Sequence, residues 1–323
     1  MLPKPKCQVI AIEEHYWDPE LTKHFKGSEA PKGLEIDKWL NDFGDIRVKQ
    51  MDEAGIDMQV LSHGAPSAQK LPPDSAVSVT RTVNDRLAER IAANPQRFAG
   101  FAAVPTTASA SEAADELERA VTKLGMKGAM LHGLSNGEFL DLPKYWPIYE
   151  RAEKLDVPIY LHPSTPDPRV MDVYYRDYAQ DYPLLARPAW GYTVEAATQA
   201  IRLILSDVFE KHPKLKIILG HLGETLPFLS WRVDSALRRP GGKELDFRGI
   251  FQRNFWITTS GFFADAPLQC CMTEMGVDRI LFAVDWPFVA DNKPGVEWLG
   301  RAPISDTDKV KIASGNAKQL LRL

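Results

Sequence analysis

The sequence has little of the features that would place a protein outside the cell or in a membrane. It contains only three cysteines in 323 residues, too few for a disulfide framework. No stretch approaches the roughly 18 uninterrupted apolar residues of a membrane span. Residues 1–8 lead directly into the first expected strand, without an apolar export segment and a small-residue cleavage site. We therefore expect a cytoplasmic protein with no membrane partner.

An excess of charge of one sign is also missing. The 39 basic and 43 acidic residues are interspersed and leave a net charge of −4, so no basic face marks a nucleic-acid surface. We expect no nucleic-acid partner. With 44% hydrophobic residues the chain can bury one large core, and we interpret residues 1–323 as a single domain.

The sequence does contain eight short apolar segments that alternate with helical segments. Each is rich in β-branched or aromatic residues and apolar on both faces, which is typical of strands in a parallel sheet. The expected strands are residues 9–13, 58–62, 98–103, 128–131, 158–162, 216–220, 255–259 and 280–284. Eight strand–helix units close a (β/α)8 or TIM barrel, so the predicted fold class is α/β.

Several segments between these strands have recognisable boundaries. One helix is expected to begin at a Ser111 cap and to end before Gly125, and another to span residues 74–94. Residues 16–40 and 163–192 are long for barrel loops, and both leave strand ends that carry ligand candidates, so we expect them to cover or shape a pocket.

Residues 239–252 form a third long segment. They contain Pro240, Gly241 and Gly242, and we expect an exposed excursion with no chemistry of its own.

Side chains that bind metal ions lie at the ends of several expected strands. Glu13 and His15 end the first, His162 ends the fifth, His221 follows the sixth and Asp285 follows the eighth. The carboxyl ends of all eight strands converge on one face of a barrel, so these side chains are predicted to meet there. Imidazole nitrogens and carboxylate oxygens suit zinc or manganese.

Strand alternation sends Glu13 and His15 to the same side, into the barrel mouth, and points Glu14 outward, where we expect a structural role. A lone strand-end histidine is more often a hydrogen-bonded structural residue. That interpretation would have to hold separately for His15, His162 and His221, so the set favours a site. His63 and His132, after strands two and four, are further candidates facing the mouth.

Longer motifs extend from residue 11 to residue 322. They are Ala11-Ile12-Glu13-Glu14-His15, Tyr160-Leu161-His162-Pro163, Ile218-Leu219-Gly220-His221-Leu222-Gly223-Glu224, Leu226-Pro227, Trp231-Arg232, Thr258-Thr259-Ser260-Gly261, Leu281-Phe282-Ala283-Val284-Asp285-Trp286-Pro287-Phe288 and Asn316-Ala317-Lys318. With these motifs the chain resembles the amidohydrolase superfamily, and more closely its branch of non-oxidative aromatic acid decarboxylases, of which γ-resorcylate (2,6-dihydroxybenzoate) decarboxylases are typical.

The resemblance implies one divalent metal ion per subunit, zinc or manganese, held by Glu13, His15, His162 and Asp285. The remaining coordination positions stay open for water or substrate. Binuclear relatives usually add a modified lysine at the end of strand four, where this chain has Met130-Leu131-His132. A mononuclear site is therefore expected.

The resemblance also implies decarboxylation of a hydroxybenzoate. The metal chelates a ring hydroxyl and the carboxylate, and Asp285 delivers a proton to the ring carbon that bears the carboxylate. His221 positions or polarises the substrate, with Glu224 as its orienting partner. The alternative for Glu224 is a carboxylate in the first turn of a helix, stabilised by the helix dipole.

The substrate is expected to be a small aromatic carboxylic acid. Arg232 matches a position that contacts substrate polar groups, reaching a pocket only at the rim of its own subunit or of a neighbour; the alternative is a surface salt bridge. Phe288, Trp190 and Trp17 are candidate walls for an aromatic ring, with Phe288 preferred, although aromatic residues are more often core. The resemblance also implies a homodimer or homotetramer.

The same ligands and His221 also serve metal-dependent hydrolases of lactones and esters, in which a metal-bound water with a pKa near roughly 7 attacks a carbonyl. The combination of the Glu-Glu-His, Asp-Trp-Pro-Phe and Trp-Arg motifs favours the decarboxylase, with the hydrolase as the alternative. A non-enzymatic scaffold comes third, because no ligand is missing.

Overall fold

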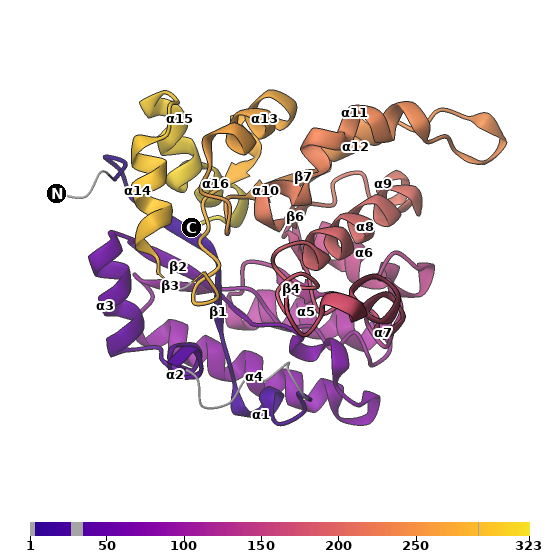
Figure 1. Ribbon diagram of the computed structural model, residues 1–323. Coiled ribbons are helices and arrows are strands. Elements are labelled where there is room, and N and C mark those ends of the chain that lie inside the picture. The colour runs from indigo at the N-terminus through magenta and orange to yellow at the C-terminus, as the bar shows by residue number, and fades with distance from the viewer. Residues whose placement is uncertain (1–3, 27–34, 290) are drawn as a thin grey trace.

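The computed structural model describes residues 4–26, 35–289 and 291–323 (Figure 1). Part of the first long loop, residues 27–34, lies outside the described residues. Eight parallel strands form the centre of the fold: β1 (Ile10–Tyr16), β2 (Met58–His63), β3 (Phe98–Gly100), β4 (Ala129–His132), β5 (Ile159–His162), β6 (Ile217–Leu219), β7 (Phe255–Thr258) and β8 (Ile280–Leu281). They lie at or close to the predicted positions, except that β1 continues to Tyr16 and that β3 and β8 end earlier than predicted.

The strands close into a ring. Strands β1 to β3 pair in sequence order, and so do β4 to β8. Backbone hydrogen bonds join these groups. Among them, Ala102 N donates to Gly128 O at 2.9 Å between β3 and β4, and Ile12 N donates to Phe282 O at 3.2 Å between β1 and the chain after β8. The predicted (β/α)8 barrel is therefore confirmed.

Helices surround the strands (Figure 1). They are α1 (Pro19–Thr22), α2 (Glu35–Asn41), α3 (Asp45–Ala54), α4 (Pro73–Ala93), α5 (Ala110–Leu124), α6 (Trp146–Leu155), α7 (Pro168–Val170), α8 (Gly191–Leu205), α9 (Val208–Lys211), α10 (Gly220–Glu224), α11 (Leu226–Ala236), α12 (Phe247–Asn254), α13 (Asp265–Met275), α14 (Lys293–Arg301), α15 (Asp306–Val310) and α16 (Asn316–Leu321). None of the described helices is long and apolar enough to cross a membrane.

The predicted cap of α5 is wrong by two residues. Ser109, not Ser111, caps the helix, because Glu112 three residues later returns the hydrogen bond and completes a capping box. The helix ends as predicted at Gly125, whose φ of 75° suits glycine.

The segment after α11 agrees with its prediction only in its first half. The turn at Pro240–Gly242 lies on an arm that extends away from the barrel between α11 and α12 (Figure 1). The second half forms α12, which buries Phe247 and Phe251 in the core and so is not an exposed excursion. The spacing of these two aromatic residues places them on one face of a helix.

Side chains from alternate strand positions fill the barrel below its mouth. This inner cluster includes Ile12, Val60, Phe101 and Ile218, and α16 contributes Leu320. A second, larger cluster lies between the strands and the surrounding helices. The filled interior confines chemistry to the carboxyl ends of the strands.

Candidate active site

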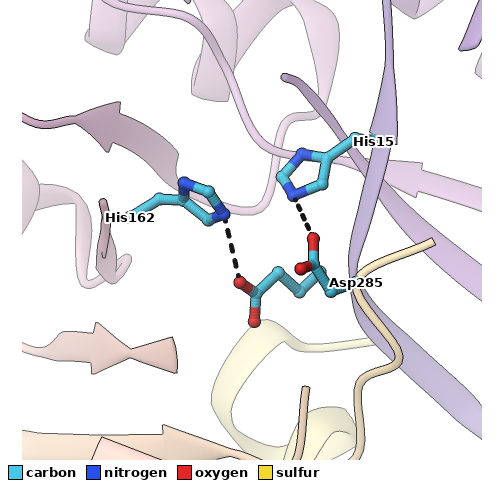
Figure 2. A group of neighbouring side chains, drawn as sticks. His15, His162 and Asp285 are labelled. Atoms are coloured by element: carbon cyan, nitrogen blue, oxygen red, sulfur yellow. Dashed lines mark ion pairs between the residues drawn. The ribbon is translucent and has the colours of Figure 1, made fainter. Parts of the chain in front are cut away.

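The four predicted metal ligands lie together at the carboxyl ends of the strands. One donor atom each from Glu13, His15, His162 and Asp285 lies within 4.8 Å of the other three. His15 Nε2 is 3.1 Å from Asp285 Oδ1, and His162 Nε2 is 3.3 Å from Glu13 Oε1. Figure 2 shows the two imidazoles turned toward carboxylate oxygens between them.

Each of these residues presents one buried atom that has no hydrogen-bond partner. The atoms are Glu13 Oε1, His15 Nε2, His162 Nε2 and Asp285 Oδ1. Unpaired buried polar atoms are costly and uncommon, so four of them directed at one point indicate a missing partner. Two imidazole nitrogens and two carboxylate oxygens fit a zinc or manganese ion.

In three of the four ligands, Glu13, His15 and His162, the second polar atom is already engaged. Glu13 Oε2 accepts hydrogen bonds from the hydroxyls of Tyr160, Thr258 and Ser260, which leaves Oε1 for the site. His162 Nδ1 lies 2.7 Å from the carbonyl of Pro163. That contact places the proton on Nδ1 and directs the Nε2 lone pair into the site.

His15 is oriented in the same way, with Nδ1 3.2 Å from Ser62 Oγ. Burial lowers the pKa of His15, which favours the neutral imidazole that a metal requires. Burial raises the pKa of Glu13, but His221, His162 and His15 outweigh it and lower that pKa below its usual range. The carboxylate is therefore ionised.

His221 and Glu224 lie on a left-handed turn after β6. The φ angles are 50° at His221, 51° at Leu222 and 52° at Glu224. A side chain on Gly220 would come within 3.1 Å of Glu13 Oε1, so a glycine allows the turn to approach the ligands. Glu224 is therefore not in the first turn of a right-handed helix, and that alternative is wrong.

The turn pairs His221 with Glu224 as predicted. His221 Nδ1 lies 2.6 Å from Glu224 Oε1, while its Nε2 is 3.6 Å from Glu13 Oε1 and 3.7 Å from Asp285 Oδ2. Burial lowers the pKa of His221, but Glu224, Glu13 and Asp285 outweigh it and raise the pKa well above its usual value. The imidazole can therefore hold a proton beside Asp285.

A cavity of about 370 Å³ opens above these groups. Its lining includes His162, His221, Glu224 and Asp285 on the polar side and Phe288 on the apolar side. The ring of Phe288 lies 5.4 Å from that of His15. The volume is in the range of small-molecule sites and the apolar wall suits an aromatic ring.

Comparison with known proteins agrees with this geometry. The family model described as amidohydrolase matches residues 10–323. The chain belongs to the amidohydrolase family. A γ-resorcylate decarboxylase from Rhizobium sp. strain MTP-10005 is 39% identical over 97% of this chain and 98% of its own length.

Solved structures of this amidohydrolase group also match over almost the whole chain. A 2,6-dihydroxybenzoate decarboxylase in complex with 2,6-dihydroxybenzoate has a TM-score of 0.88 at 38% identity, covering 98% of both chains. A dihydroxybenzoic acid decarboxylase from Polaromonas sp. JS666, with manganese and 2-nitroresorcinol bound, has a TM-score of 0.88 at 38% identity, covering 98% of this chain and 97% of the other. The protein is thus a decarboxylase of the amidohydrolase family.

The four residues predicted to contact the substrate ring or its polar groups differ in whether they line the cavity. Phe288 and Trp17 line it. Trp190 is half exposed and Arg232 is exposed on α11, and neither is among the described lining residues. Their assignment as substrate contacts has no support within one subunit.

The two further histidine candidates, His63 and His132, are not among the described lining residues of the cavity. His132 Nδ1 lies 3.0 Å from His162 Nδ1, and His63 Nε2 accepts a hydrogen bond from the backbone of Asp18 at 3.0 Å. They position a ligand and the first loop, respectively.

Two features of the site were not predicted from the sequence. They are the hydroxyl groups of Tyr160, Thr258 and Ser260, which orient Glu13, and the guanidinium group of Arg187, which lines the cavity. Tyr160 lies two residues before His162 on the same face of β5, so strand alternation could have identified it. Arg187 is the only lysine or arginine among the described lining residues. It lies in the predicted 163–192 loop, but no pattern distinguishes it from the other polar residues there.

Glu195 on α8 supports the loop from behind the site. Its Oε2 accepts a hydrogen bond from Ser164 N at 3.2 Å, and its Oε1 accepts one from Gln199 at 2.6 Å. Burial raises its pKa to about 7, although both hydrogen bonds oppose the shift. The folded protein therefore holds a proton here that the unfolded chain releases at lower pH.

We predict that Glu195→Gln reduces the pH dependence of stability. In the wild type the folded-state pKa is raised, so the contribution of Glu195 is complete below about pH 4.5 and is lost as pH rises through about 7. A tenfold difference in proton affinity between the folded and unfolded states corresponds to about 1.4 kcal/mol. Urea unfolding at pH 5 and pH 8 should show a smaller loss of stability in Glu195→Gln; an equal loss in both proteins contradicts the assignment.

Proposed function

We propose that this protein is a metal-dependent, non-oxidative decarboxylase of a hydroxybenzoate. The observation that carries the proposal is the set of four unpaired ligand atoms beneath a cavity with an aromatic wall. Relatives named as decarboxylases of γ-resorcylate, which is 2,6-dihydroxybenzoate, are similar over almost the entire chain and support the substrate class.

Glu13, His15, His162 and Asp285 would hold one divalent ion per subunit, either zinc or manganese. Such an ion supplies Lewis acidity and a fixed point for the carboxylate and adjacent hydroxyl of the substrate. Manganese in the similar Polaromonas structure supports this choice. The three hydroxyls on Glu13 Oε2 keep that carboxylate from rotating away from the site.

The chain's own residues position the ring and move the proton. Phe288 packs against one face of the ring, and Asp285 delivers a proton to the ring carbon that carries the carboxylate. The new C–H bond takes a ring electron pair. Cleavage of the C–C bond then releases CO2 and returns an electron pair to the ring, so each turnover consumes one proton.

His221 replaces that proton. Its Nε2 faces Asp285 Oδ2 at 3.7 Å, and Glu224 holds the opposite side of the imidazole at 2.6 Å. The arrangement lets His221 transfer a proton to Asp285 after each turnover, while Glu224 maintains the orientation of the ring.

Arg187 adds a substrate contact from the 163–192 loop. It forms no ion pair with any described residue, although it lines the cavity. A guanidinium paired with the departing carboxylate would stabilise the reactant, because CO2 leaves without charge. We therefore place Arg187 on a second polar substituent of the ring, whose charge does not change in the reaction.

We place the protein in the cytoplasm because all three cysteines are free.

Exposed aromatic residues on the surface support a homodimer or homotetramer. On α11, Phe228 and Trp231 are 80% and 70% exposed. Exposed aromatic residues of this size are typical of interfaces. In such an oligomer Arg232, adjacent to Trp231, and Trp190 would contact a neighbouring subunit and not their own cavity.

The decisive assay is CO2 release by manganese- or zinc-loaded protein from a panel of hydroxybenzoates that begins with 2,6-dihydroxybenzoate. We expect metal-dependent release, and a loss in kcat of about 10²-fold or more in Asp285→Asn because the proton donor is removed. Metal-bound protein that releases no CO2 from any member but hydrolyses lactones or esters would establish the alternative hydrolase.

We predict that Arg187→Ala raises KM by about 10- to 100-fold with kcat nearly unchanged, because a charge-assisted hydrogen bond is worth about 1.5–3 kcal/mol and this one is the same in reactant and transition state. Arg169→Ala is the control, since Arg169 is exposed on the same loop and pairs with Asp167. A fall in kcat at unchanged KM, or equal effects of both variants, would remove Arg187 from the substrate.

A further inference from the structure

The backbone at Asp285 adopts a conformation that an L-amino acid rarely takes. Its φ is 71°, in the left-handed region, although the residue is an aspartate. Residues with a side chain are disfavoured in this region because their Cβ approaches the following carbonyl oxygen, and aspartate adopts it only occasionally. The conformation directs a ligand carboxylate into the site, so other interactions must hold it there.

Glu14 makes those interactions. Its Oε1 accepts a hydrogen bond from Val284 N at 2.9 Å, and its Oε2 accepts one from Trp286 N at 3.2 Å. These are the peptide groups on either side of Asp285. Glu14 is fully buried. It lies between the ligands Glu13 and His15 in the chain, and its side chain extends away from the cavity.

Arg47 on α3 holds the second ligand from the same side. Its Nη2 donates to the carbonyl of His15 at 2.6 Å, and its guanidinium lies 4.1 Å from the ring centroid of Trp286. The His15 N–H donates to the carbonyl of Trp286 at 2.7 Å. The peptide groups of His15 are thus engaged on both sides.

Gln59 of β2 connects the side chains of Glu14 and Arg47. Its Oε1 accepts from Arg47 Nη1 at 3.1 Å, and its Nε2 lies 3.4 Å from Glu14 Oε2. Arg47 is fully buried, as Glu14 is. Burying these two ionisable groups costs more than burying apolar side chains of the same size, so packing alone does not explain their presence.

We propose that Glu14 and Arg47 form a brace that positions the metal ligands Asp285 and His15. The carboxylate of Glu14 spans the two N–H groups around Asp285, and Arg47 holds the carbonyl of His15 and the indole of Trp286. Neither residue contacts the substrate cavity; both are positioning residues. The inference rests on the proposed function only in taking these ligands to bind a metal ion.

The test is metal binding by Glu14→Gln. The amide oxygen can accept one of the two N–H groups, but its NH2 group would oppose the other. We expect manganese affinity, measured by calorimetry on metal-free protein, to fall by about 10- to 100-fold, as for other residues that orient metal ligands. The electron paramagnetic resonance spectrum of bound manganese should also change, because Asp285 shifts.

Glu116→Gln is the matched control. Glu116 is an equally buried carboxylate, but it bonds to Arg81, Arg119 and Asn84 between α4 and α5, away from the ligands. We expect this variant to lose thermal stability while keeping wild-type manganese affinity and spectrum.

Arg47→Lys provides a second route if Glu14→Gln does not fold. Lysine keeps the charge but cannot hold both the His15 carbonyl and Gln59 in one planar geometry. We expect weaker manganese binding and, at saturating manganese, a lower kcat with little change in substrate KM.

Wild-type manganese affinity and spectrum in a folded Glu14→Gln or Arg47→Lys protein would overturn the brace. The manganese-binding measurement needs no substrate. If the wild type binds manganese but releases no CO2, the proposed function is contradicted, and the brace is judged only by the manganese affinities of the variants. A wild type that binds no metal overturns both.

Discussion

Four buried polar atoms without hydrogen-bond partners, two from imidazoles and two from carboxylates, converge at the barrel mouth, and the neighbouring residues are arranged around them. Glu13 Oε1, His15 Nε2, His162 Nε2 and Asp285 Oδ1 point at one another at the barrel mouth. A fold holds such a cluster only where its other bonds are strong or a cation satisfies it. Hydrogen bonds to Glu13 Oε2, His162 Nδ1 and His15 Nδ1 determine which atom each of these three ligands presents.

The regions below, above and outside the metal ligands have different roles. Below the ligands, the filled barrel excludes water. Above them, His221 and Glu224 lie on a left-handed turn, where we propose that they relay a proton, and Phe288 forms an apolar wall. Outside the barrel, Glu14 and Arg47 hold the backbone at the ligands. In this proposal the proton moves on the cavity side of the metal ligands, and the backbone of the ligands is supported from the opposite side.

Much of this could be predicted from the sequence because the period of a strand and the convergence of strand ends are general. They place Glu13, His15, His162 and Asp285 together although nearly the whole chain separates the first from the last. Strand alternation also predicted that Glu14 points away from the barrel mouth. It could not predict the hydrogen bonds of Glu14 to the backbone of Val284 and Trp286, because these depend on the path of the chain after β8. The left-handed turn at His221 and the position of Arg187 depend on tertiary packing that leaves no periodic signal. Arg232 matched a motif, yet its own subunit places it on the surface.

The most direct measurement is a crystal structure of the manganese-loaded protein with an anomalous difference map. We predict one peak per subunit among Glu13 Oε1, His15 Nε2, His162 Nε2 and Asp285 Oδ1, at distances of about 2.0–2.2 Å, which suit a divalent ion with nitrogen and oxygen ligands. A peak at another place, or manganese-soaked crystals in which these four atoms bond only to one another and to water, would contradict it.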